Sequence, residues 1–132
     1  VKLISGQYWR KAKAPEQENL VEAFRNYSAA NYAFRFDGFS GQKFFILSNT
    51  RGPSGSRVVT TQIKSISGKP VRIAYVLREA NGVWSIIDLI LAGGISELAT
   101  RRSEYRKILA IGGTKALTTV LIAKTKRLLT AD

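Results

Sequence analysis

Asp88 is the residue of this chain whose surroundings most favour chemistry. It lies between Ile86-Ile87 and Leu89-Ile90, where an unpaired carboxylate would be costly. Such a carboxylate can bind backbone amides or an arginine, or it can act as a general base beside a hydroxyl donor such as Tyr75. We favour the structural role over contact with a ligand. Catalysis is the least favoured reading, because the chain has no histidine and the same face carries no second acid.

The composition narrows the possible reactions further. The chain contains neither cysteine nor histidine, which removes thiolate nucleophiles, Ser-His and Cys-His triads and zinc sites with nitrogen or sulfur ligands. Gly112-Gly113-Thr114-Lys115 lacks the spacing of a phosphate loop and predicts a helix break instead. We therefore expect a protein that is not an enzyme and that holds no cofactor or metal.

Positive charge is the second chemical feature. The chain has 21 Lys and Arg residues against 9 Asp and Glu residues, a net charge of +12. Such a surface favours anionic partners, although it can also serve only solubility. Arg101, Arg102 and Arg106 are candidates for docking a partner, with a solvated helix face as the alternative. Most aromatic residues fall on inward periods rather than among the basic residues, so we expect no nucleic-acid partner.

Length and hydropathy indicate one domain. A chain of 132 residues, 45% hydrophobic and 23% charged, is typical of a single globular domain. No run approaches the ~20 apolar residues of a membrane span, so no transmembrane segment is expected. The chain starts at Val1 without a recognisable signal peptide, which indicates a processed or trimmed product.

Four helical segments are predicted, two ahead of a central set of strands and two after it. Residues 1–5 look like the end of a helix that Gly6 closes. A long amphipathic helix begins near Pro15 and ends near Phe36, and Gly112-Gly113 separates two further helices at 96–111 and 114–129. Apolar residues recur at helical spacing in the long helix, namely Leu20, Ala23, Phe24, Tyr27, Ala30 and Phe34.

Between the helices the apolar period changes to two. Segments at 43–50, 57–66, 71–78 and around Trp84 predict an antiparallel meander in sequence order, and Asn81-Gly82 predicts a tight hairpin. Strict alternation places Trp84, Ile86, Asp88 and Ile90 together on one face. The fold class is therefore α+β, with helices against one face of the sheet. By itself an apolar face of this kind is more often a plain core than a ligand cavity.

Several motifs in a fixed order carry a resemblance to a known family. They are Tyr8-Trp9-Arg10 ahead of Pro15-Glu16-Gln17, the Phe36-Asp37-Gly38-Phe39-Ser40-Gly41 turn, the W-x-I-x-D strand at 84–88 and the GISELATRRSEY segment at 94–105. In this order they resemble the toluene-tolerance proteins, the periplasmic phospholipid shuttles of MlaC type. The last segment is most similar to the hopanoid-associated HpnM branch.

The resemblance implies a fold like nuclear transport factor 2, in which a curved four-stranded antiparallel meander packs against amphipathic helices and encloses an apolar cavity for acyl chains. The inward positions then become candidate lipid-binding residues. These are Phe24, Tyr27, Phe34, Phe44, Ile46, Val59, Thr61, Ile63, Ile73, Tyr75, Leu77, Trp84, Ile86, Asp88, Ile90, Tyr105, Leu109, Leu117 and Leu121.

Two features depart from the family pattern. Members carry helices ahead of the Tyr-Trp-Arg segment, and we expect residues 1–132 to be a single lipid-binding domain without them. Ala92-Gly93-Gly94 replaces the usual acidic residue before the Gly-(Val/Ile)-Ser turn.

The resemblance implies a periplasmic carrier that shuttles a phospholipid or a hopanoid-type lipid between membrane-bound lipid-transport complexes. The alternative is a small-molecule-binding protein or isomerase-type enzyme of the same fold that uses Asp88.

Overall fold

The computed structural model describes residues 1–35, 38 and 40–131. The chain folds into two compact units, a helical unit formed by Val1–Gly38 with Arg101–Asp132 and a sheet unit formed by Phe39–Thr100. The α+β class is confirmed. Within the predicted turn that follows the long helix, Phe36, Asp37 and Phe39 lie outside the described residues.

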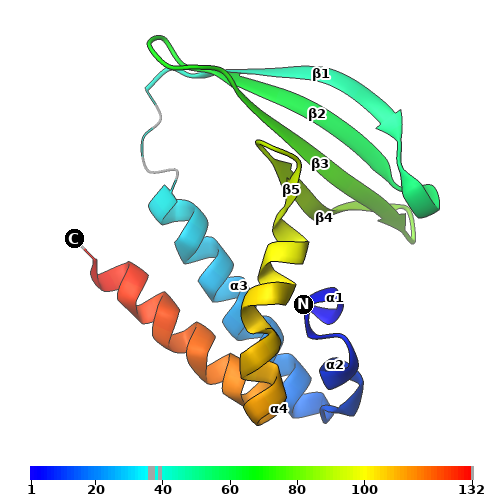
Figure 1. The fold of residues 1–132 in the computed structure, drawn as a ribbon, viewed down its shortest axis with the longest axis vertical. Helices are drawn as coiled ribbons and strands as arrows, with labels where there is room; N and C mark the ends of the chain where they lie inside the picture. The colour runs from blue at the N-terminus through cyan, green and yellow to red at the C-terminus, as the bar shows by residue number, and fades with distance from the viewer. Residues whose placement is uncertain (36–37, 39, 132) are drawn as a thin grey trace. The chain divides into compact units, whose positions relative to one another are not determined.

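The helical unit contains two short helices and two long ones (Figure 1). The elements are α1 (Lys2–Ser5), α2 (Gln7–Lys11), α3 (Ala14–Arg35) and α4 (Glu97–Thr130), the last of which begins in the sheet unit. Gly6 separates α1 from α2 with φ 53° and ψ −122°, a backbone conformation that glycine adopts readily. The break at Gly6 is confirmed, whereas the sequence pattern had not predicted α2 as a separate helix.

The core of the helical unit is built from one stripe on α3 and from both halves of α4. Leu20, Ala23, Tyr27 and Ala30 are buried on α3, which confirms the spacing of the predicted stripe. Phe24 is half-buried and Phe34 is 56% exposed, so this stripe loses contact with the core at the C-terminal end of α3. The partners of the stripe on α4 are Tyr105, Leu109, Leu117 and Leu121, all at most 3% exposed.

A sharp break divides α4 into two arms. Gly112 and Gly113 have non-helical dihedral angles, and Gly113 takes φ 60° with ψ −153°. The two arms, 97–111 and 114–130, turn back on each other at this point (Figure 1). By length and composition α4 is apolar enough to cross a membrane. The break at Gly112-Gly113 nevertheless leaves each arm shorter than the ~20 residues that a membrane span requires. Leu109 and Leu117, on either side of the break, are both buried in the core of the helical unit.

The sheet unit is an antiparallel meander in sequence order, as predicted. Its strands are β1 (Lys43–Arg51), β2 (Arg57–Lys64), β3 (Val71–Ala80), β4 (Val83–Leu91) and the short β5 (Ile95–Ser96), with a 3-10 turn, η1 (Pro53–Gly55), between β1 and β2. Asn81 and Gly82 have φ values of 52° and 76°, which is the signature of the tight hairpin predicted between β3 and β4. Within the described residues, β5 is the one strand beyond the four that were predicted.

A β-bulge in β4 changes which residues share a face. Leu77 pairs with Ile86, whereas its neighbour Val76 pairs with Asp88, so Ile87 is an extra residue. Paired residues of antiparallel strands project to the same side of a sheet. Ile86 therefore shares a face with Leu77, while Asp88 lies on the opposite face with Val76. The prediction that Trp84, Ile86, Asp88 and Ile90 share one face is wrong, because the extra residue reverses the alternation.

We call the side of the sheet that carries Ile73 the apolar face. The strand register places ten of the predicted lipid-binding residues on it, namely Phe44, Ile46, Val59, Thr61, Ile63, Ile73, Tyr75, Leu77, Trp84 and Ile86. A second bulge in β1, at Leu47, keeps Phe44 and Ile46 in line with Ile63 and Thr61. Bulges bend and twist the strand that contains them, so these two contribute curvature at both sides of the meander.

Candidate functional site

The apolar face is buried at its centre and open at its margins. Thr61 and Ile73 are 2% and 8% exposed, and the Thr61 hydroxyl donates a 2.8 Å hydrogen bond to the Ile73 carbonyl. By contrast, four bulky side chains on the same face remain between 47% and 69% exposed, namely Phe44, Ile46, Trp84 and Ile86. Exposed apolar patches of this kind are typical of surfaces that bind proteins, membranes or apolar ligands.

The predicted residues on α3 and α4 lie in the other compact unit. Tyr27, Tyr105, Leu109, Leu117 and Leu121 are all buried in the core of the helical unit. There they fill the space between α3 and the two arms of α4, which is the structural role that apolar stripes usually have. A contact between any of them and a lipid stays a prediction.

The core of the helical unit also contains an unusual aromatic and cationic cluster. The Arg101 guanidinium donates a 3.2 Å hydrogen bond to the Tyr27 hydroxyl and a 3.1 Å charged hydrogen bond to Glu104. It lies 5.4 Å from the centre of the Tyr27 ring, and the Lys124 ammonium lies 5.8 Å from both the Tyr27 and Tyr105 rings. These are cation–π distances, so the two cations help to hold α3 against both arms of α4.

Tyr105 is fully buried at the centre of this cluster. Burial raises the pKa of Tyr105 to about 12, and the nearby Arg101 charge opposes that shift. The Tyr105 hydroxyl has no hydrogen bond of normal geometry in the described structure, although the Arg101 guanidinium is near enough to favour the ionised phenolate. An unsatisfied buried hydroxyl is destabilising, so removal of this hydroxyl alone should not lower the stability of the fold.

The three arginines predicted for docking have different environments. Arg102 and Arg106 are exposed, as a docking surface requires. Arg101 does not fit this prediction, because only 9% of its surface is exposed and its guanidinium is committed to Tyr27 and Glu104. A helical residue one position from a solvated neighbour points about 100° away from it, and here that rotation carries Arg101 into the core.

Asp88 is a hydrogen-bond acceptor at the start of α4. Its Oδ1 accepts bonds from the Leu89 amide at 2.8 Å and the Leu98 amide at 2.9 Å, and its Oδ2 accepts a bond from the Ser96 hydroxyl. Ser96 in turn accepts a 3.0 Å bond from the Ala99 amide. Two of the first amides of α4 are thereby capped by side chains, which is the structural role we favoured for Asp88.

The arrangement needed for acid–base chemistry is not assembled. The β4 bulge places Asp88 on the face of Val76, whereas Tyr75 projects from the apolar face. The predicted base and its predicted donor are thus on opposite sides of the sheet. In the part of the chain that the structure describes, no group of three or more acidic residues could hold a metal ion.

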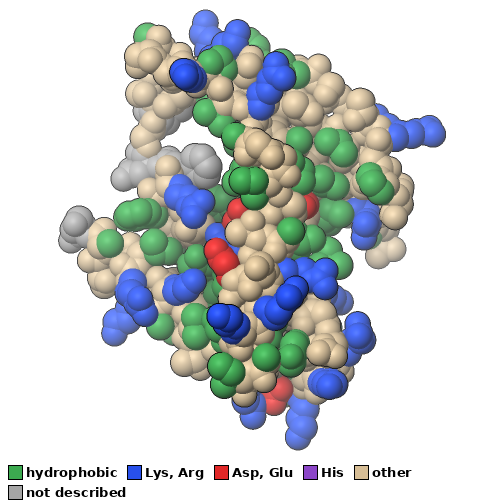
Figure 2. All heavy atoms as spheres, in the orientation of Figure 1, with side chains coloured by type: hydrophobic (Ala, Val, Ile, Leu, Met, Phe, Trp, Pro, Cys, Tyr) green, Lys and Arg blue, Asp and Glu red, His purple; other side chains and the backbone are tan. Residues whose placement is uncertain are grey.

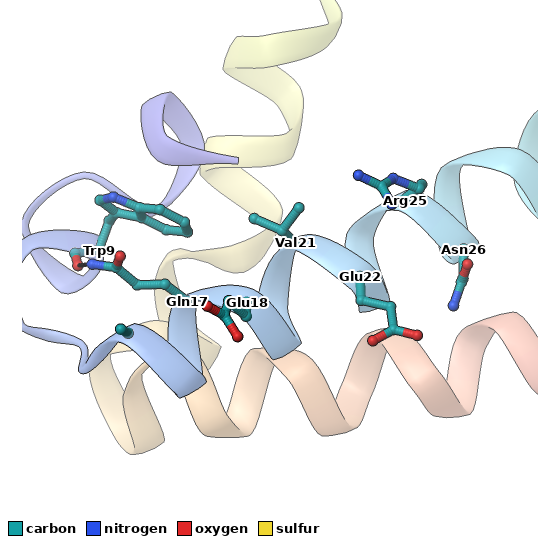
Figure 3. Close-up of a pocket in the computed structure, with 8 residues that line it drawn as sticks. Trp9, Gln17, Glu18, Val21, Glu22, Arg25 and Asn26 are labelled. Carbon is teal, nitrogen blue, oxygen red and sulfur yellow. Dashed lines mark hydrogen bonds between the residues drawn. The ribbon is translucent and has the colours of Figure 1, made fainter.

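Two open pockets lie within the helical unit. The first, of about 440 Å³, is lined by Trp9 of α2 and by one face of α3 that includes Glu18, Val21 and Glu22 (Figure 3). At its edge the Gln17 side chain donates hydrogen bonds to the Trp9 carbonyl at 2.8 Å and the Ala12 carbonyl at 3.2 Å. The Trp-Arg and Pro-Glu-Gln motifs are therefore physically joined, because Gln17 ties α2 to the start of α3.

The second pocket, of about 470 Å³, lies between the α1–α2 corner and α4. Its lining includes Arg102, Arg106 and Leu109, three of the predicted site residues, together with Tyr8 of the Tyr-Trp-Arg motif and Ser5, which the sequence did not single out. Nothing in the local sequence marks Ser5, since it reads only as the last residue of a short helix.

The sequence pattern of the family described as MlaC protein matches residues 1–123. The chain belongs to the MlaC family. Among solved structures, the phospholipid-binding protein of Ralstonia solanacearum, determined in complex with a phospholipid, is similar with a TM-score of 0.84 and 18% identity over 98% of this chain and 72% of that one. This similarity confirms the predicted fold of an MlaC protein.

Proposed function

We propose that this MlaC-family protein is a periplasmic carrier that holds a phospholipid or a hopanoid-type lipid and passes it between membrane-bound lipid-transport complexes. Membership of the MlaC family and the fold shared with a phospholipid-binding protein support a phospholipid as the cargo. The similarity of residues 94–105 to the HpnM branch supports a hopanoid-type lipid as one possible cargo. We further propose that residues 1–132 act as one lipid-binding domain.

The exposed margin of the apolar face is the observation that carries this proposal. Phe44, Ile46, Trp84 and Ile86 leave large apolar surfaces in contact with water, and each would gain about 25 cal/mol per Å² on burial against an acyl chain. In this proposal the acyl chains lie along the apolar face over Ile73. Asp88 and Ile90, on the opposite face, then play no part in binding the cargo, which revises the list of lipid-binding residues expected from the sequence.

Mass spectrometry of lipid that co-purifies with the protein tests the proposal directly. The protein expressed in a lipid-containing host should carry phospholipid or hopanoid-type lipid in a defined ratio to protein. Native lipid extraction, followed by quantification against protein, measures that ratio. Purification of a folded protein without any lipid, and without uptake of lipid from vesicles, would contradict the carrier function.

Two neighbouring phenylalanines offer a matched pair of variants for locating the cargo. Phe44 is on the apolar face opposite Ile63, and Phe45 is on the other face opposite Gln62. They are 56% and 41% exposed, so a charge should be tolerated by the fold at either position. Phe44→Asp should lower lipid occupancy strongly because a carboxylate cannot be solvated under an acyl chain, while Phe45→Asp should leave occupancy nearly unchanged. Equal effects of the two variants would place the lipid elsewhere.

A further inference from the structure

Arg102 and Arg106 form a pair of cations at one pocket. They are four residues apart in the first arm of α4 and therefore neighbours on one helix face. Both line the pocket of about 470 Å³ at the α1–α2 corner. Within the described parts of the chain neither arginine forms an ion pair or a side-chain hydrogen bond. Two like charges at this spacing repel each other, so an anion between them would relieve an unfavourable interaction.

Ser5 supplies the independent observation that points to a ligand. It lines the same pocket, it is only 2% exposed, and its hydroxyl has no hydrogen-bond partner in the described structure. Buried hydroxyl groups are normally hydrogen-bonded. Ser5 therefore offers an unused hydrogen-bond donor in the lining of a pocket that also contains two unpaired guanidinium groups.

The backbone at Gly6 brings these groups together. Its positive φ of 53° turns the chain between α1 and α2, and it lets Ser5 at the end of one helix and Tyr8 in the next line the same pocket. Leu109, which is 3% exposed, lies on the same pocket. A volume of about 470 Å³ is within the usual range for small-ligand sites.

We propose that this pocket of the helical unit binds a phosphate group through the guanidinium groups of Arg102 and Arg106 and the hydroxyl of Ser5. Guanidinium forks match the oxygens of a phosphate with paired hydrogen bonds, and the serine adds a neutral donor. The phosphate group can belong to a phospholipid headgroup or to a soluble phosphate compound. Only the first source rests on the proposed carrier function, because phosphate binding by itself does not require a carried lipid.

Titration with inorganic phosphate, followed by NMR shifts of backbone amides around Ser5 and Arg102, tests the site. The double variant Arg102→Gln/Arg106→Gln should weaken phosphate binding by at least about tenfold. The double variant Lys126→Gln/Arg127→Gln removes the same charge from exposed positions in the last turns of α4, and it should change binding by less than about twofold. Equal losses in the two double variants would overturn the proposal, since general attraction by a basic surface would then explain the binding.

The Ser5→Ala variant distinguishes phosphate binding in this pocket from general attraction by the basic surface, because it leaves the charge of the protein unchanged. It should weaken phosphate binding by about three- to tenfold, while the melting temperature stays the same or rises because the hydroxyl has no partner to lose in the free protein. Unchanged phosphate affinity in folded Ser5→Ala would remove Ser5 from the site and overturn the proposal as stated.

Vesicle binding distinguishes the two sources of phosphate. If the site takes headgroups, the protein should prefer phosphatidylcholine vesicles that contain phosphatidylglycerol over phosphatidylcholine alone, and Arg102→Gln/Arg106→Gln should lose that preference more than Lys126→Gln/Arg127→Gln. Binding of inorganic phosphate without any vesicle preference would support the site and assign it to a soluble compound. Lipid occupancy is measured in the same preparations, and failure of the carrier function would leave the original protein without lipid. Failure of this site would leave the original protein loaded, and phosphate binding would then respond neither to Arg102→Gln/Arg106→Gln nor to Ser5→Ala.

Discussion

Asp88 and Ser96 together bond two of the first amides of α4, those of Leu98 and Ala99. These two side chains connect the strand β4 to the helix that follows it. The carboxylate accepts bonds from the Leu89 and Leu98 amides and from the Ser96 hydroxyl. An uncapped helix start leaves its amides without partners. A carboxylate at that end also interacts favourably with the helix dipole, so the charge itself contributes to stability.

Asp88→Asn should therefore lower the free energy of unfolding by about 1–2 kcal/mol, because the amide offers one acceptor oxygen where the carboxylate offers two. Lipid occupancy should hardly change. Urea unfolding followed by circular dichroism measures the first quantity, and lipid extraction the second.

Ser85→Ala, at an exposed position of the same strand, is the control and should be nearly neutral. A variant that keeps its stability but loses its lipid would return Asp88 to the binding site.

The burial of Tyr105 should make the stability of the fold depend on pH in the alkaline range. Burial raises its pKa to about 12, above the ordinary value of about 10. In the unfolded chain the phenol loses its proton near pH 10, whereas the folded protein keeps it until about pH 12. The folded state therefore binds more protons in this window, and stability falls as the pH rises from 10 to 12.

Tyr105→Phe should remove this part of the pH dependence. At neutral pH its stability should equal or slightly exceed that of the original protein, because the lost hydroxyl has no partner in the described structure. Between pH 10 and 12 the variant should lose less stability, by on the order of 1–2 kcal/mol. Parallel unfolding curves for the two proteins across this range would contradict the assignment.

At the scale of elements, breaks and bulges in regular structure decide which side chains meet. The Gly112-Gly113 break folds α4 back so that Leu109 and Leu117 enter one core. The Ile87 bulge changes the face of every residue that follows it in β4. The break and the bulge each involve only one or two residues, yet each changes the environment of several side chains.

Gly113→Ala tests the break in α4. The φ of 60° and ψ of −153° at this position lie in a region that is almost restricted to glycine, and an added Cβ should cost about 1–3 kcal/mol of stability. Thermal unfolding measures the loss. Ser103→Ala, an exposed substitution in the first arm, should leave the melting temperature unchanged, and an equally stable Gly113→Ala would mean that the two arms can meet in another way.

At the scale of the whole molecule, the net charge of +12 should affect how fast the protein meets anionic membranes more than how firmly it retains a bound lipid. Figure 2 shows basic side chains spread over the visible surfaces of both units, with few acidic ones between them. Long-range attraction by such a surface weakens at high ionic strength, since the Debye length is only about 8 Å at physiological salt. Retention of a lipid depends on apolar burial, which moderate salt hardly affects.

Lipid transfer to anionic vesicles should therefore slow several-fold as salt increases from low to physiological concentration, whereas lipid retention stays constant. A fluorescent lipid-transfer assay measures the rate, and uncharged vesicles provide the control because their rate should not depend on salt. Transfer that is insensitive to salt with both kinds of vesicle would show that the positive charge does not assist encounter.

Local patterns in the sequence determined the fold class and most element positions. The 3.6-residue period of α3, the two-residue period of the strands, the Asn81-Gly82 hairpin and the Gly112-Gly113 break all depend on backbone preferences within a few residues. The fold and family expected from the ordered motifs are also confirmed. The structural role favoured for Asp88 follows from one simple rule, that a carboxylate among apolar residues must find donors.

Tertiary structure decided the contacts that no local pattern contains. Ile86 and Ile87 are identical neighbours with apolar residues on both sides of Asp88, so the sequence could not show that Ile87 is an extra residue and that Asp88 leaves the face of Ile86. Arg101 reads like its neighbour Arg102, and only packing against Tyr27 buries it. Ser5 becomes notable because a distant helix brings two arginines to its pocket. Strand register and helix packing depend on partners far away in the chain, and for this reason they become visible only when the chain is folded.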